Sequence, residues 1–81
     1  MKRDYLLDQT TFERLCTRYE TTPDLMRSPS RAAVLARKRQ AIMYLMHKVL
    51  KIDSTIVARQ MNRDHSTVLY GAEQHEKRMQ L

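Results

Sequence analysis

The chain has 81 residues, which is enough for one small domain with a modest core and too few for a deep substrate cleft. Hydrophobic residues make up 42% of it, which excludes a disordered tail, and one Gly with two Pro disfavours a turn-rich β fold. Lys and Arg outnumber Asp and Glu by 15 to 9, a net charge of +6 that favours a polyanionic partner, nucleic acid before an anionic membrane surface.

The first quarter of the chain predicts an arm, a helix and a turn. Residues 1–7 are expected to form a flexible N-terminal arm, and residues 8–81 a single folded domain. Asp8 or Thr10 can cap a helix whose apolar stripe falls at residues 12, 15, 16 and 19. This stripe contains Cys16, the only cysteine, which we expect to be a small buried hydrophobe. Residues 21–23 should end the helix before a single turn that folds Leu25 and Met26 onto the core.

A polar, basic loop over residues 27–31 precedes the strongest helical pattern. Ser28 or Ser30 can cap a helix that runs from Arg31 to about Leu50. Its length predicts the central helix of the core. The expected apolar face consists of Val34, Leu35, Ile42, Leu45, Met46, Val49 and Leu50.

Two shorter segments follow a break at residues 51–53. Asp53 or Ser54 can cap a helix over residues 55–61, and Asp64 can cap a last helix that ends near Met79. Val68, Leu69 and Ala72 should face inward, whereas Tyr70 is expected at the edge of the core. The fold class is therefore all-α, with four or five helices and no strand pattern.

The stretch from Ser54 to Val68 predicts a helix-turn-helix. Ala58 supplies a small residue where two helices cross, Asn62 tolerates a left-handed turn, and Val68 can fix the angle of the second helix. An ordinary helical hairpin also uses such residues. The positive charge and the polar start of the last helix favour DNA binding, in which that start enters the major groove.

Residues 63–73, RDHSTVLYGAE, closely resemble the signature of the C-terminal DNA-binding domain, domain IV, of the bacterial replication initiator DnaA. Residues 36–40, ARKRQ, are similar to the A-R-P-R-Q of that family, although Lys38 stands where the family usually has proline. The resemblance covers roughly residues 8–79. It implies a Trp-repressor-like helical domain that binds a short, asymmetric duplex box in replication-origin recognition or its regulation. The turn at Asn62 lacks the Gly pair common in the family.

The resemblance does not extend to the nucleotide-binding part of the initiator. The only glycine is Gly71, so the chain has no Gly-rich phosphate loop. We expect either an isolated domain of a larger protein or a free-standing protein with the same DNA-binding domain, and in either case no ATP-driven origin opening.

The major-groove candidates are the first residues of the last helix. The carboxylate of Asp64 can cap the helix, or it can accept a hydrogen bond from the N4 amine of cytosine, and the two roles can coexist. His65 can donate to a base or a phosphate, or can be a surface histidine. Ser66 and Thr67 can reach base edges, or can be ordinary polar residues of a helix start.

Basic residues elsewhere are the candidates for contacts with the DNA backbone and minor groove. Arg63 is expected at a phosphate, and by resemblance Arg37 is our choice for entry into a narrow minor groove. A charge run is also consistent with a solvated surface. The full set is Arg31, Arg37, Lys38, Arg39, Arg63, Lys48, Lys51 and Arg59.

The leading functional hypothesis is sequence-specific binding of double-stranded DNA. The alternative is a protein-interaction module that binds a replication initiator, helicase loader or polymerase component. We expect no enzyme, because no nucleophile-base pair or carboxylate pair has a recognisable spacing, and no cofactor, small-molecule substrate or metal.

No apolar run approaches the ~20 residues that span a bilayer. We therefore expect a cytoplasmic, nucleoid-associated protein of a bacterium, phage or plasmid, without a membrane partner.

Overall fold

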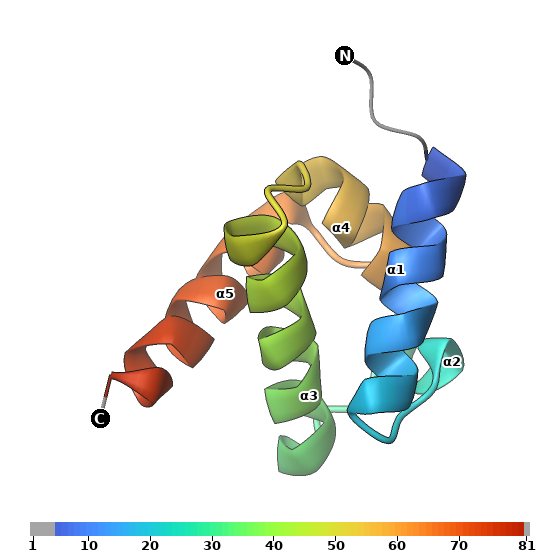
Figure 1. Ribbon diagram of the computed structural model, residues 1–81. Helices are drawn as coiled ribbons and strands as arrows, with labels where there is room; N and C mark the ends of the chain where they lie inside the picture. The colour runs from blue at the N-terminus through green and yellow to red at the C-terminus, as the bar shows by residue number, and fades with distance from the viewer. Residues whose placement is uncertain (1–4, 81) are drawn as a thin grey trace.

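The computed structural model describes residues 5–80, and the chain over this range is built from helices (Figure 1). No strand occurs among these residues, which confirms the predicted all-α class. None of the helices described is long and apolar enough to cross a membrane. In chain order the helices are α1 (Tyr5–Arg18), α2 (Pro23–Arg27), α3 (Ala33–Met43), the π-helix η1 (Tyr44–Val49), α4 (Ser54–Met61) and α5 (His65–Met79).

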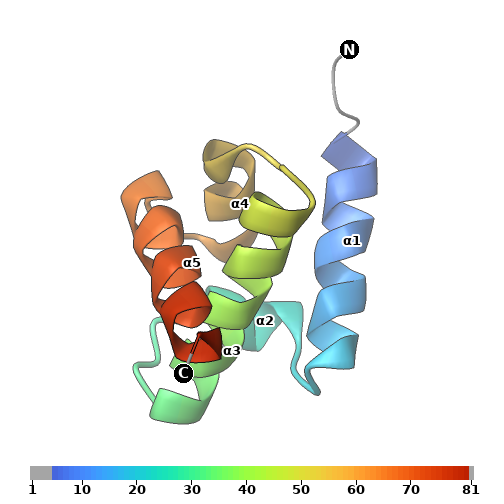
Figure 2. The same cartoon turned by 60° about the vertical axis from the view of Figure 1, so that its left-hand side comes forward.

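The long segment formed by α3 and η1 lies in the middle of the molecule, with α1 on one side and α5 on the other (Figures 1 and 2). Every other helix contributes side chains to the core around it, although Leu69, which was expected to face inward, is 42% exposed. The stripe on α1 is confirmed, since Phe12 and Cys16 are fully buried. The remaining fully buried hydrophobic residues are Met26, Ile42, Met46, Ile52, Val57, Met61, Val68 and Ala72.

Helix α1 begins earlier than the sequence suggested. It starts at Tyr5, so neither Asp8 nor Thr10 caps it, and it includes the last three residues of the expected arm. Residues 1–4 of that arm lie outside the described residues. Asp8 instead sits in the first turn, where a negative charge favours the helix. Residues 5–7, which were expected to belong to the arm, are therefore helical.

The turn after α1 is built as expected, with one correction. Thr22 caps α2 by accepting a hydrogen bond from the Leu25 amide at 3.2 Å, and Pro23 takes the first helical position, where its missing N–H costs nothing. Met26 is buried as predicted. Leu25 is 44% exposed, because a helix of one turn can direct only one of two consecutive side chains to the core.

The predicted helix over residues 31–50 is divided into two parts. It begins at Ala33 without a side-chain cap, since Ser28 donates to the Leu25 carbonyl and Ser30 accepts from the Ala32 amide. Val34 is therefore in the first turn and 65% exposed, not on the apolar face.

After Met43 the helix widens into η1. The Leu50 amide bonds to the carbonyl of Leu45 at 2.9 Å, five residues back instead of four. This shift of register turns Val49 and Leu50 outward, which corrects their expected place in the core, and brings Ile52 into it.

The helix-turn-helix forms as the sequence predicts. Asp53 caps α4 through a 2.9 Å bond from the Thr55 amide, and Asn62 adopts the left-handed conformation with φ 54° and ψ 49°. Ala58 is 5% exposed at the contact with α5, where Val68 is fully buried. The angle between α4 and α5 is thus fixed by a small residue, a left-handed turn and a buried apolar residue.

Candidate nucleic-acid interface

The first turn of α5 presents a continuous set of polar side chains. Asp64, His65, Ser66 and Thr67 are all exposed. Asp64 is the N-cap residue by conformation, but its carboxylate makes no capping bond; its backbone carbonyl accepts from the amides of Thr67 at 3.1 Å and Val68 at 3.2 Å. The capping interpretation of the carboxylate is therefore not supported, and its oxygens face outward.

Arg63, directly before this turn, is engaged with the protein itself. Its guanidinium donates to the carbonyls of Ser28, Met61 and Asn62 and lies 3.4 Å from that of Arg27. These bonds tie the loop between α2 and α3 to the turn of the helix-turn-helix. The side chain is half-buried, so its expected role as a free phosphate contact is replaced by one that positions the loop beside α5.

Arg39 was expected to contact the DNA backbone, and the structure contradicts this. The residue is only 5% exposed, because its guanidinium donates to backbone carbonyls of Leu25, Met26, Ser28 and Ser30 at 2.7–3.0 Å. Burial, and then the nearby charge of Arg63, lowers the pKa of Arg39 from its usual value. A side chain held in this way cannot reach a phosphate outside the protein.

A hollow of about 550 Å³ separates the loop from the helix-turn-helix. Arg31, which is exposed, stands at one side of it, and Asn62 and Arg63 stand at the other. A smaller hollow of about 210 Å³ continues to Thr67 and Tyr70 on α5. Figure 2 shows the loop and the first turns of α5 on the same left-hand side of the molecule. Arg31 and the start of α5 therefore share one face.

Two further candidate cations lie in the break before α4 and on α4 itself. Hydrogen bonds from Thr55 are the main cause of the lowered pKa of Asp53, and smaller contributions come from the charges of His47 and His65. Lys51 is exposed in the break between η1 and α4, with a positive φ of 60°. Arg59 is exposed on α4.

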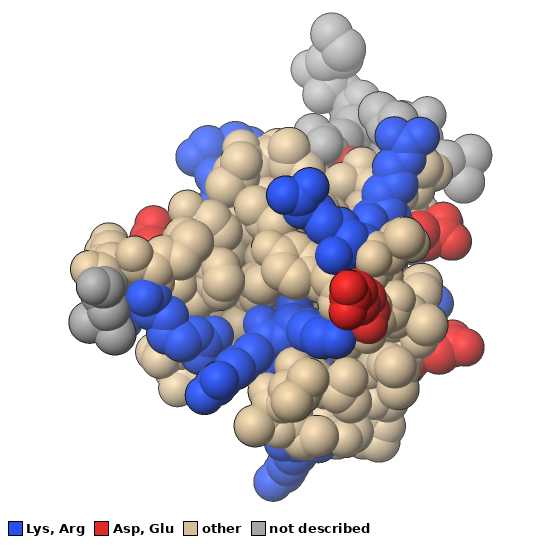
Figure 3. Space-filling model, turned by 60° about the horizontal axis from the view of Figure 1, so that its bottom comes forward, with Lys and Arg blue, Asp and Glu red and all other residues tan. Residues whose placement is uncertain are grey.

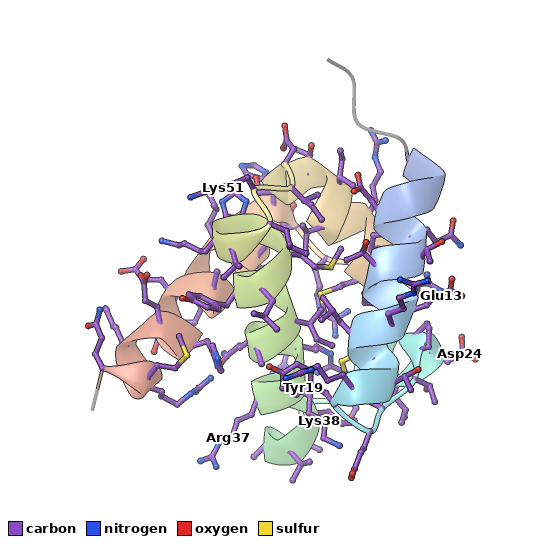
Figure 4. All side chains as sticks on the ribbon, viewed as in Figure 1. Glu13, Tyr19, Asp24, Arg37, Lys38 and Lys51 are labelled. Carbon is purple, nitrogen blue, oxygen red and sulfur yellow. The ribbon has the colours of Figure 1, made fainter. Side chains whose placement is uncertain are left out.

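Three of the predicted backbone contacts lie elsewhere. Lys48 forms an ion pair with Glu76 at 3.6 Å, in the last turn of α5. Arg37 and Lys38 line a different hollow, beside the last turns of α5. In Figure 4 both lie at the end of α3 that is farthest from Lys51. Arg37 and Lys38 thus lie on a different surface from Arg31.

Tyr70 is a further candidate contact that the sequence did not single out. It was expected at the edge of the core, yet it is 61% exposed and lies four residues after Ser66 and three after Thr67. Residues at these spacings share one helix face. This spacing was the available signal, and it extends the polar surface of α5 by one turn. Among residues 5–80, no group of His, Cys, Asp and Glu is placed to hold a metal ion.

Comparison with known proteins agrees with this geometry. The family model described as bacterial dnaA protein helix-turn-helix matches residues 9–74. The chain is 29% identical over 76 residues to the chromosomal replication initiator protein DnaA of Gloeobacter violaceus, covering 93% of this chain and 17% of that protein. It is 38% identical over 60 residues to the initiator of Lachnoclostridium phytofermentans, covering 73% of this chain and 13% of that protein.

No solved structure matches the chain. The chain spans less than a fifth of the length of these two relatives. The family match, by contrast, extends from α1 into α5 and includes every residue of the helix-turn-helix. This protein belongs to the bacterial DnaA helix-turn-helix family of DNA-binding domains.

Proposed function

We propose that this protein binds a short box in double-stranded DNA sequence-specifically, and that it acts in recognition of a replication origin or in its regulation. The observation that carries the proposal is the exposed polar first turn of α5, which shares a face with Arg31 of the adjoining loop. In a helix-turn-helix, this end of the second helix is the one that enters the major groove.

Base recognition is assigned to the side chains of that turn. Ser66 and Thr67 offer hydroxyls to base edges, and the Thr67 methyl group can contact a thymine methyl. The Asp64 carboxylate, without a capping bond, can accept from the N4 amine of cytosine, and His65 can donate to a base or a phosphate. One such contact discriminates against a wrong base by about 1–3 kcal/mol.

Backbone contacts are assigned to exposed cations. Arg31 lies beside the helix-turn-helix, and Lys51 and Arg59 are exposed in the break before α4 and on α4. Arg31 also takes the minor-groove role that the resemblance suggested for Arg37, because Arg31 is on the face of the α5 start and Arg37 is not. Arg39 and Arg63 support these contacts indirectly by holding the loop.

Tyr70 extends the interface beyond the first turn. Its hydroxyl can donate to a phosphate, and its ring can contact a base methyl group. Glu73, one turn farther, is paired with Lys77 at 3.5 Å, and a carboxylate there would be repelled by phosphates. Contacts from α5 should therefore end near Tyr70.

Selection from a pool of randomised duplexes tests the proposal without assuming a box. The protein should enrich one short asymmetric sequence, and footprinting should protect both the major groove of this box and a neighbouring stretch of minor groove. Enrichment of no sequence, with uniform retention of all duplexes, would contradict it.

The place in replication can be tested on a single origin fragment. If the protein regulates initiation by occupying boxes, it should compete with a full-length initiator for the same protected sites. Independent occupancy of separate sites by the two proteins would refute this role while leaving DNA binding intact.

A further inference from the structure

A second basic surface lies away from the start of α5, between α1, α3 and the last turns of α5. It surrounds a hollow of about 260 Å³ that is lined by Tyr19, Arg37, Lys38, Ala41, His75 and Arg78. We call this the α1–α3–α5 hollow. Figure 3, which views the molecule from below, shows basic side chains in a row across the middle of this face. Figure 4 shows Tyr19 and Lys38 between α1 and α3, with Arg37 directed outward.

The three cations of the hollow are held in place without being neutralised. The Lys38 Nζ donates to the backbone carbonyl of Glu20 at 3.1 Å, and Arg78 donates to the side-chain amide oxygen of Gln40. Arg37 is exposed. Over residues 5–80 none of the three is in an ion pair with a carboxylate, whereas Lys48 and Lys77 are paired with Glu76 and Glu73. The hollow therefore keeps its positive charge.

The floor of the hollow is largely apolar. The ring of Tyr19 and the methyl group of Ala41 contribute to it together with the imidazole of His75, which is half-buried. Burial, and then the charge of Arg78, lowers the pKa of His75 from 6.5, which favours the neutral ring. A volume of about 260 Å³ is below the usual range for a small-molecule site and suits a single apolar side chain.

A duplex bound at the start of α5 would not cover this hollow. His75 lies ten residues after His65, which is about 15 Å along the helix, and α5 points away from the groove that its first turn enters. Around α3, Lys38 lies about 200° from Ala36, which lines the hollow beside Arg31. The two basic surfaces can therefore be occupied at the same time.

We propose that the α1–α3–α5 hollow binds an acidic segment of a partner protein, with one apolar side chain in the hollow and flanking carboxylates on Arg37, Lys38 and Arg78. A second DNA duplex suits this surface less well. Glu20, whose backbone carbonyl accepts from Lys38, is exposed after the end of α1 and would repel an extended phosphate backbone. A short peptide can place its charges on the three cations alone.

The test uses the complete chain, labelled with ¹⁵N, and a defined set of peptides. Each peptide has Glu residues on both sides of a central Leu, Phe or Trp, and matched controls replace Glu with Gln or the central residue with Gly. At least one acidic peptide should bind saturably and shift the amide signals of Arg37, Ala41, His75 and Arg78. Both kinds of control peptide should bind more weakly, because one lacks the carboxylates and the other lacks the central apolar side chain.

Matched charge-removing variants locate the site. Arg37→Gln combined with Arg78→Gln should weaken peptide binding at least about tenfold, since two of three attractive charges are lost. Lys77→Gln removes a neighbouring charge that already has a partner, and should change the affinity less than about twofold. Neither variant should alter binding of the selected DNA box, so this test is separate from that of DNA recognition.

Three results would overturn the inference. The first is that no peptide of the set shifts these signals, and the second is that Lys77→Gln weakens binding as much as the double variant does. The third is that a DNA duplex, added when the start of α5 is already occupied by DNA, shifts the same signals and displaces the peptide. That last result would identify the hollow as a second DNA contact.

Discussion

At the scale of single residues, three arginines hold the loop that carries Arg31. Arg27 donates to the Gln60 carbonyl at 2.7 Å and lies 5.3 Å from the centre of the Phe12 ring. Arg39 and Arg63 donate to carbonyls of α2 and of the loop. Hydrogen bonds from a charged group contribute about 1.5–3 kcal/mol each, and unpaired buried carbonyls cost a comparable amount. These side chains therefore fix one part of the DNA interface without touching DNA.

Replacing Arg39 tests this role. Arg39→Ala leaves several carbonyls of the loop without a donor, so the free energy of unfolding in urea should fall by about 2–4 kcal/mol. Arg39→Lys should recover little of it, because an ammonium cannot reproduce the planar fork of donors. Arg37→Ala, at an exposed position of the same helix, is the control and should change stability by less than about 0.5 kcal/mol. Equal stability of the two alanine variants would contradict the assignment.

The charge run at residues 37–39 shows where residue-level prediction fails. Three consecutive cations on a helix point in three directions, and the sequence alone does not say which of them faces the core. Arg39 turns inward only because the carbonyls of α2 and the loop lie there to accept its hydrogen bonds. These acceptor carbonyls are brought together by the tertiary fold, so no local sequence pattern predicts where they lie.

Cys16 gives the protein a pH-dependent stability. Burial raises the pKa of its thiol from 9.0 to about 11, so the folded state keeps the proton after the unfolded chain has lost it. The stabilisation of the folded state by the protonated Cys16 thiol is fully present below pH 9.0 and is lost as the pH rises towards about 11. Urea unfolding of the native protein and of Cys16→Ala over this range should show their difference in stability narrowing with pH. A constant difference would mean that the thiol is not desolvated.

At the scale of elements, the contact between α3 and α5 depends on Gly71. A Cβ atom built at this position would lie 2.5 Å from the Met43 sulfur and 3.3 Å from Cγ of Gln40. The Met43 side chain can therefore occupy its present position against α5 only because this residue has no side chain. Close contact here helps to place α5, and with it the exposed turn at residues 64–67.

Gly71→Ala should destabilise the protein even though alanine favours helix by about 1 kcal/mol. We expect a net loss of about 1–2 kcal/mol in the free energy of unfolding, because Met43 must leave its position in the core. In a Met43→Ala background the same change should be neutral or stabilising, since the clashing sulfur is gone. Thermal or urea unfolding of the four proteins measures this, and an equal cost in both backgrounds would contradict the packing argument.

Elements were predictable where local chemistry decides them. Asp is a favoured N-cap residue and Asn readily adopts the left-handed conformation. Asp53 and Asn62 therefore predicted where α4 begins and ends. The π-helix did not, because an i to i−5 bond has no residue signature and results from the fit of Ile52 into the core. Its effect is a change of register that exposes Val49 and Leu50, two residues that the α-helical period places inside.

At the scale of the whole molecule, two groups of cations lie on separate surfaces. Arg31 lies beside the helix-turn-helix with Arg27 and Arg63, whereas Arg37, Lys38 and Arg78 surround the α1–α3–α5 hollow. The sequence predicted the fold class and the start of α5 as a candidate site, but not this division. The packing of α1, α3 and α5 determines which cations share a face. The spacing of residues along one helix does not predict this packing.

The most direct test is the affinity for a selected box and for its scrambled sequence, measured by fluorescence anisotropy across a range of salt concentrations. The native protein should prefer the box at least about a thousandfold, with a steep salt dependence for both duplexes. Thr67→Ala and His65→Ala should narrow the preference by about 1–3 kcal/mol, whereas Arg31→Ala should weaken both duplexes and reduce the salt slope by about one unit. An equal affinity for the two duplexes, unchanged in Thr67→Ala, would contradict recognition of bases by α5.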